Sequence, residues 1–64
     1  MDDDLHRMRI ALDMMPADQR CVFERARFHG EDYPTIAAHL GIGVGEVERL
    51  MALAMTQMVQ ALDP

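Results

Sequence analysis

Apolar residues recur along this chain at the spacing of amphipathic helices, and proline or glycine separates the successive segments. The first expected helix spans roughly residues 4–14 and ends before Pro16, because proline cannot continue a helix. The second spans roughly residues 18–28 and ends at Gly30, since glycine tolerates the left-handed conformation at a helix C-terminus. No segment is expected to form a strand.

Two further helices, joined by a glycine-rich turn, are expected in the C-terminal half. The third is short, with Asp32 placed to cap it and Gly41 placed to close it. The fourth begins near Val44 and carries one apolar stripe at the 3.6-residue period. The stripe consists of Val47, Leu50, Met51, Ala54, Met58, Ala61 and Leu62. We therefore predict an all-α fold, a small helical bundle of four helices with a C-terminal helix-turn-helix. It forms a single domain over residues 1–64, with an acidic N-terminal tail at residues 1–4.

Composition narrows the range of functions. The chain has 64 residues and a formal net charge of −5, and its six basic residues are all arginine. A net negative domain gains nothing from nonspecific attraction to nucleic acid or to anionic membranes. Cys21 is the single cysteine, so an internal disulfide is excluded, and we expect it to be a small core residue. No apolar run approaches the ~20 residues of a membrane span. A cytoplasmic protein without a membrane or small-molecule partner is the expectation.

The segment from Tyr33 to Ile42, in the pattern Tyr-x-x-Ile-Ala-x-x-Leu-Gly-Ile, is typical of helix-turn-helix proteins. Over residues 11–62 the chain resembles region 4 of bacterial sigma factors of the sigma-70 family, especially the extracytoplasmic-function type. The matching pieces are Ala11-Leu12, Met15-Pro16, Arg20-Cys21-Val22-Phe23, Gly30, Tyr33, Ile36-Ala37, Leu40-Gly41-Ile42, Val44-Gly45, Val47 and Ala54. LuxR-type response-regulator output domains share much of the same pattern.

The resemblance implies a DNA-binding function. In the family this domain contacts the −35 promoter element through the major groove and docks on the flap of RNA polymerase. The third helix would brace the fourth, whose first turns would present side chains to base edges. The DNA-binding residues expected here are Arg20, Arg25, Arg27, Thr35, Gly45, Glu46, Glu48 and Arg49. Region 2, which melts the −10 element in the family, has no counterpart in these residues, so we do not expect a complete sigma factor.

The charge of the fourth helix departs from the family pattern. Families of this type usually carry serine at the N-cap, a small hydroxyl residue after the glycine, and basic residues on the exposed side. At those places this chain has Gly43, Glu46, Glu48 and Leu53. The two glutamates could accept a hydrogen bond from cytosine N4, or they could stabilise the positive N-terminal end of the helix. Arg49 could contact guanine or phosphate, or it could be ion-paired with a nearby glutamate. Thr35 stands where the family usually has glutamate.

Surplus apolar residues on the fourth helix allow a second hypothesis. Leu53 lies opposite the core stripe, and Met55 and Val59 widen the stripe at its flank. They are either part of a broad core stripe with one exposed leucine, or a surface that binds a partner protein.

From the resemblance and the charges together, the chain is predicted to be a stand-alone transcription regulator that binds duplex DNA with weak intrinsic affinity. The alternative is a sigma-like interaction module that binds RNA polymerase, an anti-sigma factor or a second copy of itself.

The remaining residues do not suggest a catalytic or metal site. The spacings of Cys21, His6, His29 and His39 match no zinc pattern. His29 and His39 are expected near helix C-termini. The glycines at positions 41, 43 and 45 follow a helix, whereas a dinucleotide-binding loop follows a strand. We expect neither enzymatic activity nor a cofactor.

Overall fold

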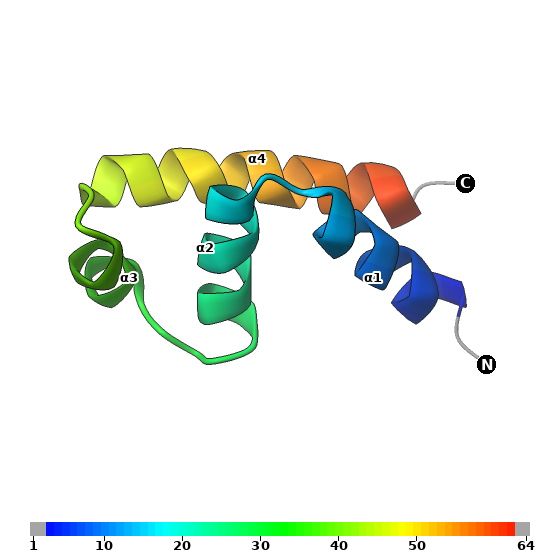
Figure 1. Ribbon diagram of the computed structural model, residues 1–64, viewed down its shortest axis with the longest axis horizontal. Helices are drawn as coiled ribbons and strands as arrows, with labels where there is room; N and C mark the ends of the chain where they lie inside the picture. The colour runs from blue at the N-terminus through cyan, green and yellow to red at the C-terminus, as the bar shows by residue number, and fades with distance from the viewer. Residues whose placement is uncertain (1–2, 63–64) are drawn as a thin grey trace.

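The computed structural model describes residues 3–62, which form four helices (Figure 1). They are α1 (Asp3–Met14), α2 (Ala17–Arg27), α3 (Tyr33–Leu40) and α4 (Val44–Leu62). The predicted all-α bundle is confirmed, and the first two helices begin within one residue of their predicted starts. Met1 and Asp2 of the predicted acidic tail lie outside the described residues, and α1 already begins at Asp3. None of the described helices has the length and apolar character needed to cross a membrane.

Local chemistry sets the ends of α3 as the sequence predicts. The backbone N–H of Thr35 donates a hydrogen bond of 2.9 Å to the Asp32 carboxylate, which caps the helix. Hydrogen bonds from Thr35, from its side chain first and then from its backbone, lower the pKa of Asp32. At the other end Gly41 has φ of 69°, the left-handed conformation, and its N–H donates to the carbonyl of Ala37.

The turn into α4 is closed by the carbonyl of Gly43. This carbonyl accepts hydrogen bonds from the N–H groups of Glu46 and Val47, both at 3.1 Å. Gly43 therefore occupies the predicted N-cap position without supplying a side chain to it. The sharp turn from Gly41 to Gly43 then sets α4 at an angle to α3, as a helix-turn-helix requires.

Helix α4 is central to the packing, because each of the other three helices packs against it (Figure 1). The buried side of α4 carries Val47, Leu50, Met51, Ala54 and Met58, which confirms most of the predicted stripe. Ala61 and Leu62 are half-buried and pack against the same core. The other helices contribute Ala11, Leu12, Met15, Val22, Phe23, Ile36 and Ala37. Helices α3 and α1 lie at opposite ends of α4, with α2 between them.

Candidate nucleic-acid interface

The first turns of α4 form the exposed surface of the helix-turn-helix. Gly45 and Glu48 are exposed, and nothing lies within 4 Å of the position that a Cβ at Gly45 would take. Thr35 is exposed in the first turn of α3, where its backbone N–H is committed to the Asp32 cap. An approaching macromolecule could therefore reach the backbone of α4 near Gly45 without displacing a side chain.

Glu46 and Arg49 form an ion pair on this surface. The Nε–H of Arg49 donates to Oε1 of Glu46 at 2.9 Å, and Nη2 donates to Oε2 of the same carboxylate. The hydrogen bond with Arg49 lowers the pKa of Glu46, and the hydrogen bond with Glu46 raises the pKa of Arg49. Of the alternatives that the sequence left open for Arg49, the structure shows pairing with a nearby glutamate.

The arginines of α2 are also engaged within the protein. Arg20 lies 3.9 Å from Asp13 and 3.8 Å from Glu24, and both partners are themselves exposed. Arg27 donates a hydrogen bond of 3.4 Å to the sulfur of Met55. Ion pairs at this exposure are weak, so Arg20 could exchange its carboxylates for phosphate. Each arginine of the expected basic patch therefore has a contact within the protein, and the patch itself stays a prediction.

Arg25 belongs to a cluster that the sequence did not predict. Its Nη1 lies 3.2 Å from Oε2 of Glu31 and 3.0 Å from Nδ1 of His39, which is itself 3.3 Å from Oε1 of Glu31. Hydrogen bonds with Cys21 and Glu31 raise the pKa of Arg25. The cluster joins the end of α2, the following turn and the end of α3. Arg25 is half-buried there, and its contacts connect these three parts of the bundle.

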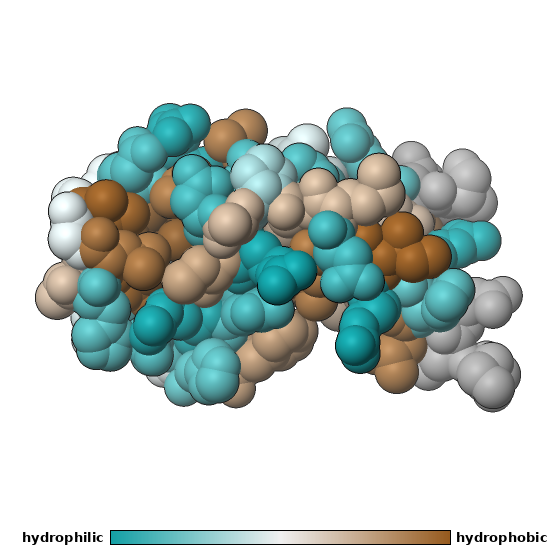
Figure 2. Space-filling model, viewed as in Figure 1, coloured by the Kyte–Doolittle hydropathy of each residue, from teal (hydrophilic) through white to brown (hydrophobic). Residues whose placement is uncertain are grey.

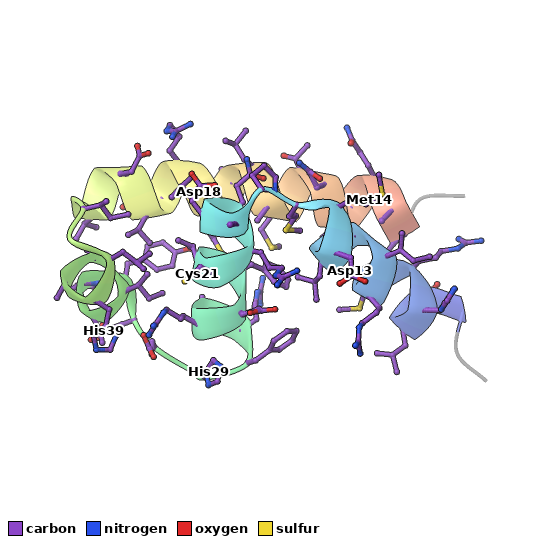
Figure 3. All side chains as sticks on the ribbon, in the orientation of Figure 1. Asp13, Met14, Asp18, Cys21, His29 and His39 are labelled. Atoms are coloured by element: carbon purple, nitrogen blue, oxygen red, sulfur yellow. The ribbon has the colours of Figure 1, made fainter. Side chains whose placement is uncertain are left out.

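The histidines and the cysteine lie partly as expected. His29 and His39 project from the ends of α2 and α3, on the side of the molecule away from α4 (Figure 3). Cys21, which was expected in the core, is only half-buried and borders the pocket that Arg25 and Glu31 line. Within residues 3–62 no three His, Cys, Asp or Glu side chains are placed to hold a metal ion.

The three apolar residues predicted to bind a partner lie on two sides of α4. At 3.6 residues per turn, Leu53 is roughly 120° around the helix from Val59 and roughly 160° from Met55. Leu53 is 40% exposed and Val59 is 61% exposed, whereas Met55 is half-buried beneath Arg27. Figure 2 shows apolar side chains breaking the hydrophilic surface at both ends of the molecule, over α3 and over α1.

An open groove between α1 and α2 was not predicted. It has a volume of about 720 Å³ and is lined by Leu5, His6, Met8, Arg9, Leu12, Asp13, Arg20, Glu24 and Phe28. Leu5, on the apolar side of the first predicted helix, lines the groove and is 65% exposed. In Figure 1, α1 slants away from α2 toward its N-terminus. Phe28 stacks edge-on against Phe23 with 5.9 Å between ring centroids, yet it remains exposed. The sequence shows that Leu5 and Phe28 are apolar, but their exposure at the groove is known only from the structure.

The fold and this surface define a helix-turn-helix protein of the kind that contacts duplex DNA or the transcription machinery. The chain belongs to the Sigma-70, region 4 family, whose model matches residues 5–58. Comparison with curated proteins and with solved structures found no match. Membership of the family places the protein in transcription, with promoter DNA or RNA polymerase as the general kind of partner, and in a non-catalytic class of domain.

Proposed function

We propose that the protein is a stand-alone transcription regulator of the cytoplasm that binds duplex DNA with weak intrinsic affinity. The observation that carries this proposal is the exposed start of α4. The side chains of Glu48 and Arg49 are exposed there, and the backbone is accessible at Gly45. A helix held in this way fits the major groove with its N-terminal residues toward the bases.

Weak affinity follows from the charges near this surface. Many DNA-binding proteins neutralise about 6–10 phosphates, and those contacts supply most of the affinity. Only four arginines lie on α2 and α4, and carboxylates pair with Arg20, Arg25 and Arg49. A monomer would therefore make few phosphate contacts, and a second copy or a polymerase would have to supply the rest.

Fluorescence anisotropy with labelled duplexes tests the proposal, using Arg49→Ala and Arg9→Ala as a matched pair. Each variant removes one positive charge, but Arg9 lines the groove between α1 and α2 instead of the helix-turn-helix surface. We expect Arg49→Ala to weaken binding by roughly 5- to 100-fold, as loss of one base contact does. Arg9→Ala should cause only the smaller, sequence-independent loss that one charge produces.

The proposal fails if no duplex binds more tightly than ~100 μM at ~50 mM salt, where nonspecific binding by ordinary DNA-binding proteins is already measurable. Equal losses in the two variants would also contradict it, because they would show that only net charge matters.

The second candidate function is a protein-interaction module that keeps the sigma-like shape. The exposure of Leu53 and Val59, together with the open groove beside α1, favours it. Exposed apolar surface of this kind in a small domain is often covered by another protein chain. The partner would be RNA polymerase, an anti-sigma factor or a second copy of this chain.

A further inference from the structure

The ion pair between Glu46 and Arg49 leaves one edge of the guanidinium unused. Arginine carries five N–H donors in a planar fork. Glu46 accepts from Nε–H and from one N–H of Nη2, which is the side edge of that fork. Both N–H groups of Nη1 and the second N–H of Nη2 remain, and no other described residue accepts a hydrogen bond from them. The end edge of Arg49 is therefore available to a ligand.

The remaining edge matches the major-groove face of guanine. Guanine presents O6 and N7 there as two adjacent acceptors, and paired N–H donors of arginine bind both at once. Arg49 is well placed for such a contact, because at 3.6 residues per turn it lies roughly 160° around α4 from the buried Val47. Its side chain is 58% exposed, in the second turn of the helix.

Resting on the proposed DNA-binding function, we propose that Arg49 recognises a guanine in the major groove and that Glu46 is the positioning residue that orients its guanidinium. An arginine free to rotate loses conformational entropy when it binds a base, and a side chain already held by two hydrogen bonds loses less. The pair also explains how a glutamate is accommodated on a surface that faces phosphates, because its charge is neutralised by Arg49.

The pair can be altered without endangering the fold. Exposed ion pairs contribute little to stability, so replacing Glu46 should leave the helices intact. Asp4→Asn offers a control, because it also removes one negative charge but lies on α1, at the opposite end of α4 from the helix-turn-helix. Circular dichroism would verify equal helix content in all variants.

The test is selection from duplexes with a randomised core, retained on immobilised protein at ~50 mM salt. Wild type and Asp4→Asn should enrich sites with one fixed guanine. Replacing that base by 7-deazaguanine, which lacks the N7 acceptor, should weaken binding roughly 5- to 100-fold. Glu46→Gln and Arg49→Lys should lose most of this discrimination, while binding of Glu46→Gln to duplexes without the guanine should rise because one negative charge is gone.

Each other outcome overturns a distinct claim. Full guanine discrimination in Glu46→Gln would show that Glu46 does not position Arg49, and equal losses in Glu46→Gln and Asp4→Asn would reduce its role to charge. Retained duplexes without a fixed guanine would overturn the inference, and the proposed function would still stand if Arg49→Ala weakens their binding more than Arg9→Ala does. Retention of no duplex at all would overturn the proposed function and the inference with it.

Discussion

Arginine side chains on α2 and α4 are held chiefly by the protein's own carboxylates. Arg49 pairs with Glu46, Arg20 with Asp13 and Glu24, and the α2–α3 cluster holds Arg25. The Glu46–Arg49 pair could be predicted from the sequence, because residues three apart on a helix are neighbours. The contact between Arg25 and His39 could not, because it joins residues 14 apart through the packing of α2 on α3. Counting arginines therefore overstates the charge available to DNA.

At the same scale, the cap of α3 predicts a pH dependence of stability. The folded-state pKa of Asp32 is lowered by Thr35, so its contribution is present above the unfolded pKa of about 3.9 and is lost as pH falls through the lower folded value. Asparagine also caps helices but does not ionise. In thermal unfolding followed by circular dichroism, we expect Asp32→Asn to lose less Tm than wild type as the pH is lowered below about 4.

Asp32→Ala serves as the control for that measurement, because alanine removes the cap at every pH. Its Tm should be lower than that of wild type already at neutral pH. An acid-induced fall in Tm as large in Asp32→Asn as in wild type would show that the carboxylate charge contributes nothing.

The helices themselves were largely predictable, because their ends are set by local chemistry. Asp32, Gly41 and the Pro16 break act on neighbouring residues, and each is found where the sequence placed it. The surfaces between helices were less predictable. The open groove between α1 and α2 depends on how α1 diverges from α2, and spacing within one helix carries no information about the angle between two helices.

Two glycines at the α3–α4 junction predict opposite effects of the same substitution. Gly41→Ala places a side chain at φ of 69°, which costs about 1–2 kcal/mol even though space for the Cβ is open. Gly45→Ala lies in the helix, again with open space, and should stabilise by up to about 1 kcal/mol. Urea denaturation followed by circular dichroism measures both. A stabilising effect of Gly41→Ala would contradict the left-handed assignment at the end of α3.

At the scale of the whole molecule, the net negative charge disfavours DNA binding, and the exposed apolar surface favours binding to a protein. The net charge of −5 opposes DNA binding, while Leu53, Val59 and the groove beside α1 offer apolar area. The separation of Leu53 and Val59 around α4 could be worked out from their positions, but their degree of exposure depends on which sides of α4 the other helices cover. A partner that covers one of these surfaces would leave the other free.

Leu53→Asp and Val59→Asp compare the two sides of α4. If the protein self-associates or binds a partner protein through the Leu53 side, Leu53→Asp should dissociate the complex and leave helix content unchanged. Val59→Asp should then have no effect on the complex, because it lies on another side. Sedimentation velocity and a pull-down with RNA polymerase measure the two cases. Profiles for Leu53→Asp identical to wild type in both experiments would count against an interface on this side.

Helices α1, α2 and α3 all bury their apolar sides against α4. Each of the three is too short to be stable alone in water, so all three depend on α4. A protease cut at the Gly41–Gly43 turn would therefore do more than release a tail. It would leave two pieces whose apolar sides have each lost their cover, and the short helices would unravel unless the pieces reassociate. Turnover of the protein would then depend on cleavage at one short turn, in which Gly41 and Gly43 are exposed and Ile42 is half-buried.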